Sequence, residues 1–433
     1  MAITPTTHGQ ATGTVRQPAH IPSARRWCWS RIRRAPPGCP ATNRIAASTA
    51  DGPHPLPTSG FSIATTLIAS CPFAASDPDT EVQRARGPLD APIGTLGDID
   101  PQIGECGVPP LTAARCYAIP LRTRFRGITV REGMVVEGPA GWGEFCPFPE
   151  YGDAEAAVWL AAAVEQATVG RPAPVRDSVP VNAIVPAVGP EQAHAAVVRS
   201  GCRTAKVKVA DHPGSLPDDL ARVEAVRDAL GPAGAVRVDA NGVWDVDTAV
   251  AAVRALDRAA GGLEYVEQPC RTIEELAAVR RRVDVRIAAD ESIRRADDPL
   301  HVAVAGAADV AVLKCTPLGG VARALRVAEA AGLPCVVSSA LETSVGLAAE
   351  IALAAALPEL DFACGLGTLA LLDGDLVAEA EGLRPVDGRL PVPRTPPAPD
   401  PDLLDLYRAD PARERWWRER ITRAAELLPV TYL

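Results

Sequence analysis

The sequence lacks three features that would each assign it to a large class of proteins. It has no apolar run long enough to span a membrane, so we expect no membrane partner. It has no excess of basic residues, because 44 lysines and arginines stand against 53 aspartates and glutamates, for a formal net charge of -9. Without a basic stripe to meet phosphates, nucleic acid is not an expected partner either.

Paired cysteine motifs are also absent. The chain has 11 cysteines, an odd number, and none are spaced as Cys-x-x-Cys. Four of them lie in or beside segments that we predict as strands: Cys270, Cys315, Cys335 and Cys364. This usage is typical of reduced core residues and not of a disulfide framework, so we expect a cytoplasmic protein.

Residues 1–110 differ in composition from the rest of the chain. They are rich in Pro, Thr, Ser, Gly and Arg and show no sustained hydrophobic periodicity, which favours a disordered tail or an over-long predicted start. An apolar run at residues 61–71 resembles the core of an export signal. Because that run begins about sixty residues into the chain and lies far from the arginine cluster at residues 25–34, we expect no export.

The most informative segment is residues 204–314, where ionisable residues follow short apolar runs. The runs are rich in Val and Ile and have the length of buried strands, and segments long enough for one helix separate them. From Lys208 the steps are 31, 28, 23 and 24 residues, one strand–helix unit each. A β/α barrel keeps its chemistry at such strand ends. The residues at these ends are Lys206, Lys208, Asp239, Glu267, Asp290 and Lys314.

A second module precedes the barrel. We predict a small antiparallel sheet with strands at residues 117–121, 127–131 and 133–137, a turn at 138–143 and an Ala-rich helix at 153–168. These elements form an α+β capping domain over residues 111–178.

The barrel is predicted to occupy residues 179–370. Strands are predicted at its start, 179–185, and at its end, 334–339 and 360–364, with no clear helix after the last. Helices are predicted at residues 190–200, 216–230, 245–259, 272–281, 321–331 and 344–357, with a short one near 299–305. Residues 371–433 then pack back on the capping domain and end in an amphipathic helix at 413–427.

Asp239, Glu267 and Asp290 offer hard oxygen ligands, which suit Mg²⁺ or Mn²⁺ with positions left open for substrate and water. No Cys or His is in phase with them, so zinc is not expected. Such a cation would bind a substrate carboxylate and stabilise the charge that develops when the adjacent carbon loses a proton. The alternative is that the carboxylates pair with Arg237 and Arg286, but we expect both arginines on the helix-facing side.

The two lysines of the first charged run point to the same side of their strand. At about 7 Å and an effective dielectric near 20, their repulsion is on the order of 2 kcal/mol, which favours a neutral Lys208. We therefore predict that Lys208 is the general base and that Lys206 lowers its proton affinity. Lys314 would face Lys208 across the reacting carbon and, when protonated, stabilise an enolate.

Five motifs occur in the order found in a known superfamily. These motifs resemble those of the muconate-lactonizing subgroup of the enolase superfamily. They are Lys-Val-Lys at 206–208, Asp-Ala-Asn at 239–241, Glu-Gln-Pro at 267–269, Asp-Glu at 290–291 and Lys-Cys-Thr-Pro at 314–317. The resemblance covers about residues 116–420. Within it, residues 122–132, 141–145 and 410–417 are similar to the actinobacterial o-succinylbenzoate synthases. The resemblance implies a (β/α)7β modified TIM barrel with an α+β capping domain.

The resemblance also implies a carbon–oxygen lyase of menaquinone biosynthesis. Its reaction would be the Mg²⁺-dependent syn-dehydration of 2-succinyl-6-hydroxy-2,4-cyclohexadiene-1-carboxylate to 2-succinylbenzoate, with Lys208 taking the α-proton and returning it to the departing hydroxyl. Two alternatives stay open. An N-acylamino acid racemase, or another enolate-forming isomerase, needs the same two lysines. A non-catalytic carboxylate-binding barrel would be expected to have lost one of the charges, and all are present.

Two isomerase variants are disfavoured by the residues. Dipeptide epimerases of the superfamily show Asp-x-Asp at the eighth strand, whereas residues 361–363 read Asp-Phe-Ala. Mandelate-type relatives use a histidine base, and none of the six histidines ends a predicted strand.

Further residues are predicted to have supporting roles. Asn241 lies beside the metal site in the family, Glu291 would support Lys208 or the metal, and a polar pair after strand seven would contact the substrate. On the capping loop, Arg124 or Arg126 would bind the succinyl carboxylate. The predicted substrate-binding residues are Asn241, Ser338, Ser339 and Arg124. A monomer and a homo-oligomer are both compatible with the sequence.

Overall fold

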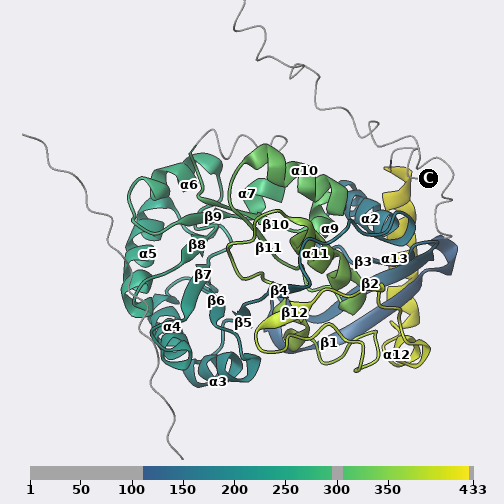
Figure 1. Ribbon diagram of the computed structural model, residues 1–433, viewed down its shortest axis with the longest axis horizontal. Helices are drawn as coiled ribbons and strands as arrows, with labels where there is room; N and C mark the ends of the chain where they lie inside the picture. Colours follow the sequence, from purple (N-terminus) through teal and green to yellow (C-terminus); the bar gives the residue numbers. More distant parts are fainter. Residues whose placement is uncertain (1–110, 295–305, 429–433) are drawn as a thin grey trace, which may run out of the picture. The chain divides into compact units, whose positions relative to one another are not determined.

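The computed structural model describes residues 111–294 and 306–428 (Figure 1). The predictions made for residues 1–110 and for a helix near 299–305 lie outside the described residues. Among the described helices, none combines the length and the hydropathy needed to cross a membrane.

The capping domain is built on an antiparallel sheet in the order β1 (Arg115–Phe125), β2 (Ile128–Gly138) and β3 (Gly141–Phe145). Two predictions were wrong here. The strands predicted at 127–131 and 133–137 are one strand, and most of the predicted turn at 138–143 belongs to β2 and β3. Gly133 and Gly143 lie inside β2 and β3, where they allow close packing and do not end the strands. A Cβ on Gly133 would lie 2.7 Å from the Tyr117 hydroxyl, and one on Gly143 would lie 2.0 Å from the Ala163 carbonyl oxygen of α2 (Asp153–Thr168).

A parallel sheet of seven strands forms most of the barrel. Its spatial order is β11-β10-β9-β8-β7-β6-β5, so each strand lies beside its neighbour in sequence. The strands are β5 (Ala183–Val185), β6 (Thr204–Lys208), β7 (Ala235–Asp239), β8 (Tyr265–Glu267), β9 (Ile287–Ala289), β10 (Val310–Leu313) and β11 (Cys335–Val337). Their short Val- and Ala-rich cores are buried on both faces, as expected for parallel strands covered by helices.

The barrel closes through two residues in place of a full eighth strand. Cys364 bridges to Val181 and Gly365 bridges to Ser338, with a bond of 2.7 Å from the Cys364 amide to the Pro180 carbonyl. The strand predicted at 360–364 is therefore shorter than expected. Phe362, which precedes the closure, packs edge-on against Tyr265 with ring centroids 5.9 Å apart.

The first predicted strand, 179–185, is divided. β4 (Ser178–Pro180) pairs antiparallel with β12 (Arg389–Pro391), and only β5 joins the barrel sheet. Pro180 lacks the amide hydrogen that a central strand would donate, which separates the two pieces.

The helices around the barrel agree with the predicted ranges to within one residue at each end. They are α3 (Pro190–Ser200), α4 (Leu216–Leu230), α5 (Val246–Ala260), α6 (Ile273–Arg280), α10 (Val321–Ala331) and α11 (Ser344–Ala356). Two short turns that the sequence did not reveal, α7 (Glu291–Arg294) and α9 (Cys315–Leu318), begin directly after Asp290 and Lys314. After the closing residues a 3-10 turn, η3 (Gly367–Leu371), stands where an eighth helix would begin, which gives the (β/α)7β pattern.

The C-terminal segment returns to the capping domain. α12 (Pro401–Leu406) contacts β1, and α13 (Pro411–Glu426) lies along α2, as Figure 1 shows. Trp417 is fully buried, with its ring edge-on to Phe145 at 5.9 Å between centroids. The Arg420 guanidinium donates to the carbonyls of Phe148 and Tyr151 at 3.0 and 2.7 Å.

We expect Trp417→Ala to lower the free energy of unfolding by about 3–5 kcal/mol, because a large buried ring leaves a cavity between α13 and the capping sheet. Chemical denaturation followed by circular dichroism measures this loss. The matched control is Trp416→Ala, since the Trp416 ring is only half-buried and lies against Arg413 and Arg420. Equal losses in the two variants would contradict the packing described here.

Candidate active site

The charged residues of the sequence converge at the C-terminal end of the barrel strands. Lys206 and Lys208 belong to β6, Asp239 ends β7, Glu267 ends β8, Asp290 follows β9 and Lys314 follows β10. Because these strands are consecutive neighbours in the sheet, the three carboxylates lie in a row with lysines on both sides. Each carboxylate is about 1% exposed, so each charge needs a partner within the protein.

The lysines supply those partners. The Nζ atoms of Lys206 and Lys208 lie 3.0 and 2.5 Å from the same oxygen, Oδ2 of Asp239, and Lys206 also pairs with Oε1 of Glu267. At the other end of the row, Lys314 Nζ lies 2.5 Å from Oδ2 of Asp290. The arrangement therefore separates Lys208 from Lys314 by the width of the carboxylate row.

The close packing of these charges lowers the pKa of one carboxylate and raises the pKa of another. Burial acts to raise the pKa of Asp239, but the two lysines at its Oδ2 outweigh it and hold the pKa well below the usual range. Burial and the nearby Asp239 charge raise the pKa of Glu267 to about 7. Burial acts to lower the pKa of Lys206, yet the Asp239 and Glu267 carboxylates raise it well above its usual value, so this lysine stays protonated.

The same residues fit a hard divalent cation in their chemistry. Oε2 of Glu267 is buried and has no hydrogen-bond partner among the residues that the structure describes, although the other oxygen is paired with Lys206. Carboxylate oxygens of this kind are the ligands that Mg²⁺ and Mn²⁺ prefer. Across residues 111–294 and 306–428, however, no group of three His, Cys, Asp or Glu side chains is already arranged to hold an ion. Lys206, Lys208 and Lys314 are instead paired with oxygens of these carboxylates.

Arg237 does not lie where the sequence analysis placed it. It is fully buried inside the barrel, on the same face of β7 as Asp239, because residues two apart in a strand share a face. Its guanidinium contacts Glu264, the Asn182 side chain and the Ala363 carbonyl and lies 4.6 Å from the Tyr265 ring centroid. Arg286 is exposed. Neither arginine is paired with the carboxylate row in the contacts described.

Two cavities lie at the barrel mouth. The inner one, about 50 Å³, is lined by charged groups of the row together with Ser338 and Ser339. The outer one, about 850 Å³, shares Lys208 and Asn241 with it and is also lined by Arg124 and Glu291. Arg124 and Glu291 are thus placed at the entrance and not at the carboxylates.

Arg126, the other capping-loop arginine, lines both cavities. It occupies the β1–β2 hairpin turn with Gly127, and both have positive φ, 50° and 82°. This is the conformation of a tight two-residue hairpin turn. Its guanidinium lies over the Phe148 ring at 4.2 Å and donates to the Tyr151 hydroxyl at 2.5 Å. The hairpin therefore presents a cation directly above the barrel mouth.

The polar residues predicted to bind substrate have local partners. Asn241, with φ of 50°, accepts a bond of 2.8 Å from Lys208 Nζ, and its amide donates to Asp239 Oδ1 at 3.0 Å. The Ser339 hydroxyl lies 2.5 Å from that of Thr368. Ser338 and Ser339 are each 7% exposed, at the wall of the inner cavity.

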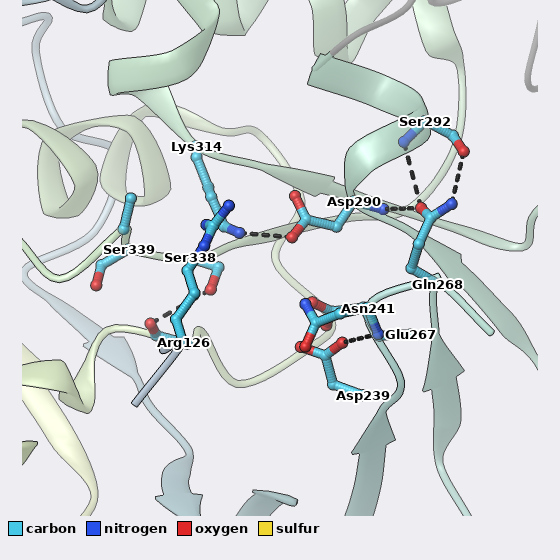
Figure 2. Close-up of polar contacts among 12 residues, drawn as sticks. Arg126, Asp239, Asn241, Glu267, Gln268, Asp290, Ser292, Lys314, Ser338 and Ser339 are labelled. Atoms are coloured by element: carbon cyan, nitrogen blue, oxygen red, sulfur yellow. Dashed lines mark hydrogen bonds and ion pairs between the residues drawn. The ribbon is translucent and has the colours of Figure 1, made fainter. Parts of the chain in front are cut away.

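Gln268 is a site residue that the sequence reasoning missed. Its buried side chain accepts from the amides of Asp290 and Ser292 at 3.0 and 3.2 Å and donates to the Ser292 hydroxyl at 2.8 Å (Figure 2). These bonds hold Asp290 in place from the side opposite Lys314. The sequence did contain a signal for this role. Gln268 is a polar residue directly after Glu267, at the end of a strand that was predicted to be buried.

Comparison with known proteins places this site in a family. Residues 190–396 match the family described as enolase C-terminal domain-like, and residues 116–167 match enolase N-terminal domain-like. An o-succinylbenzoate synthase of Thermobifida fusca is 69% identical over 280 residues, covering 65% of this chain and 87% of the relative. One of Mycobacterium tuberculosis is 55% identical over 330 residues, covering 75% of this chain and 98% of the relative.

The chain belongs to the o-succinylbenzoate synthase family of the enolase superfamily. The resemblance drawn from the sequence motifs is thereby confirmed. Solved structures show the same fold. Muconate lactonizing enzyme from Pseudomonas putida has a TM-score of 0.58 at 23% identity and covers 68% of this chain and 98% of its own. The L-Ala-D/L-Glu epimerase from Bacillus subtilis has a TM-score of 0.57 at 24% identity, covering 66% and 96%.

For this member of the o-succinylbenzoate synthase family, we expect the affinity for Mg²⁺ to rise between pH 6 and pH 8. Since the pKa of Glu267 is raised to about 7, a cation bound below that pH must displace a proton, and above it the carboxylate is already ionised. Titration calorimetry on chelator-treated protein at several pH values measures the change.

Glu267→Gln should weaken binding and remove this pH dependence. Asp361→Asn, which removes an exposed carboxylate away from the row, is the matched control and should bind as the unchanged protein does. An affinity that stays constant from pH 6 to pH 8 would contradict the assignment of Glu267 as a ligand.

Proposed function

We propose that this protein is an o-succinylbenzoate synthase, which dehydrates 2-succinyl-6-hydroxy-2,4-cyclohexadiene-1-carboxylate to 2-succinylbenzoate in menaquinone biosynthesis. The observation that carries the proposal is the row of three buried carboxylates with Lys208 at one end and Lys314 at the other. A substrate carbon above the middle of that row has an amine within reach on each side. Proton removal on one side and charge stabilisation on the other is the chemistry such a pair supports.

Asp239, Glu267 and Asp290 would hold the cation, with Mg²⁺ the expected ion and Mn²⁺ an alternative. When bound, it supplies positive charge beside the substrate carboxylate. Release of the lysines from these carboxylates would leave Lys206 and Lys208 as neighbours without a shared anion. Of the two, Lys208 is placed to meet the substrate, because it lines both cavities and its side chain is 20% exposed against 8% for Lys206.

Lys208 then acts as base and afterwards as acid. It takes the proton from the carbon that bears the carboxylate, while the Lys314 ammonium stabilises the enolate that results. The protonated Lys208 returns the proton to the hydroxyl that departs from the same face, and the ring becomes aromatic. The Asn241 side chain, which accepts a bond from Lys208 Nζ, orients the amine for both transfers.

The capping hairpin would bind the far end of the substrate. Arg126 lines the inner cavity and carries the positive charge that would pair with the succinyl carboxylate. Arg124 lines the outer cavity, where it would attract the substrate as it enters. The inner cavity of about 50 Å³ is too small to hold a substrate of this size by itself, whereas the outer cavity of about 850 Å³, which shares Lys208 and Asn241 with it, has the room. Ser338 and Ser339 would form the opposite wall.

The proposal places the reaction in the cytoplasm. All seven cysteines among the described residues are free thiols, and burial raises the pKa of Cys116 and Cys364 to about 12, which keeps them unreactive. A small-molecule carboxylate is the expected partner.

The direct test supplies the purified protein with Mg²⁺ and the cyclohexadiene substrate and follows the aromatic absorbance of the product. We expect turnover that stops on chelation and returns with added Mg²⁺. A parallel reaction with N-acyl amino acids, followed by optical rotation, tests the racemase alternative. Loss of rotation without any dehydration would overturn the proposal in favour of the isomerase.

Lys208→Ala should reduce kcat by about 10²- to 10⁴-fold, the usual contribution of a positioned acid–base group. Circular dichroism should remain unchanged, and Mg²⁺ binding should persist, because Lys208 is not a ligand. The matched control is Arg286→Ala, which removes an exposed cation just before β9, at the end of that strand away from Asp290, and should leave kcat unchanged. A Lys208→Ala enzyme with near-full rate would rule out Lys208 as the base.

A further inference from the structure

A buried glutamate outside both cavities is bonded to the backbone beside Lys314. Glu350 lies in the middle of α11, is fully buried and does not line the barrel mouth. The amide of Cys315, the residue after Lys314, lies 2.9 Å from both of its carboxyl oxygens. The amide of Thr316 lies 3.5 Å from Oε1. The carboxyl group therefore receives the first free amides of the short turn α9.

The same turn is tied to the loop after β11. The Thr316 hydroxyl donates to Oε1 of Glu342 at 2.6 Å and lies 3.3 Å from Oε1 of Glu350. Glu342 in turn accepts from the Ala340 amide at 2.7 Å. Since Ala340 directly follows Ser338 and Ser339, one chain of bonds links the ends of β10 and β11.

We propose that Glu350 is a positioning residue for Lys314, acting by fixing the backbone on which this lysine stands. The lysine is the last residue before α9, and from that backbone position its side chain reaches Asp290 at 2.5 Å. α9 has four residues and leads to Gly319 and Gly320 with φ of 87° and 121°, so it has little stability of its own. The hydrogen bonds to Glu350 of α11 hold the first amides of α9 in place and so stabilise this short turn. As a statement about catalysis, the inference rests on the proposed role of Lys314.

The carboxyl group of Glu350 accepts at both oxygens, since the Cys315 amide lies 2.9 Å from each. The Thr316 hydroxyl has a single hydrogen, and its contact of 2.6 Å with Glu342 is shorter than its contact of 3.3 Å with Glu350. Burial and the nearby Glu342 carboxylate raise the pKa of Glu350 well above its usual value, although the bonds from Cys315 and Thr316 act to lower it. A neutral amide keeps one oxygen that can accept from the Cys315 and Thr316 amides, so Glu350→Gln retains part of the support that Glu350→Ala removes.

The test compares Glu350→Gln with Glu350→Ala in the intact, Mg²⁺-loaded protein. We expect Glu350→Gln to keep kcat within about threefold. Glu350→Ala should lower kcat by about 10- to 100-fold, the usual effect of losing a support of an active group, with KM changed far less. Ile351→Val, a change at the next buried residue of α11, is the control and should lower the melting temperature without lowering kcat.

A crystal structure of each variant gives a readout that does not depend on activity. We expect the contact between Lys314 Nζ and Asp290 to persist in Glu350→Gln and to be lost in Glu350→Ala. If the unchanged protein does not dehydrate the substrate, the proposed function fails, while the structures still decide the positioning role. An intact contact or an undiminished kcat in Glu350→Ala overturns the inference.

Should Glu350→Ala not fold, Thr316→Val provides the second variant, since it removes the hydroxyl that joins the two glutamates. It should lower kcat, whereas Thr316→Ser, which keeps the hydroxyl, should restore it. Equal kcat in these two variants would also overturn the inference.

Discussion

Mutual neutralisation of buried charge is the constraint on which this structure depends. Three carboxylates of about 1% exposure stand in a row, and three lysines balance them from the two ends. Removing a charge from water costs several kcal/mol, and only close partners offset that cost. The strands must therefore meet in one order and register, since a slip by one residue would turn the charges of a strand into the surrounding helices.

Buried charge also holds the barrel closed. Where an eighth strand would complete the ladder, Cys364 and Gly365 bridge the two edges of the sheet. The Arg237 guanidinium reaches across this junction to the Ala363 carbonyl at 2.5 Å and to Asn182 at 3.1 Å, both beside the closing bonds. The hydrogen bonds of Arg237 thus join the two edges of the sheet where ladder hydrogen bonds are few. Arg237 lies two residues before Asp239 on the same strand.

The capping domain completes the mouth through two buried ionisable residues. Glu144 of β3 accepts from the Thr343 hydroxyl at 2.6 Å and from the Gly346 amide at 2.8 Å, at the start of α11. Arg131 of β2 donates to the carbonyls of Ala340 and Leu341 at 3.1 and 3.0 Å. Leu341 has φ of 68°, a conformation that persists only where its surroundings hold it. The loop that carries Ser338 and Ser339 is therefore shaped from both domains.

By itself, the sequence determined the alternation of short apolar runs with amphipathic helices, the charge at each run's end and hence the barrel class. These are local or periodic properties, so the six barrel helices were predicted to within one residue and the carboxylates and lysines were assigned to one face. The sequence did not determine that glycines continue the capping strands instead of ending them. Gly133 packs against Tyr117 and Gly143 packs against α2, and both of these partners lie elsewhere in the chain. Only the tertiary structure decided that Arg126 and not Arg124 reaches the inner cavity, and that Gln268 holds Asp290. Contacts of this kind join residues tens to hundreds of positions apart, and no pattern along the chain encodes the distance between them.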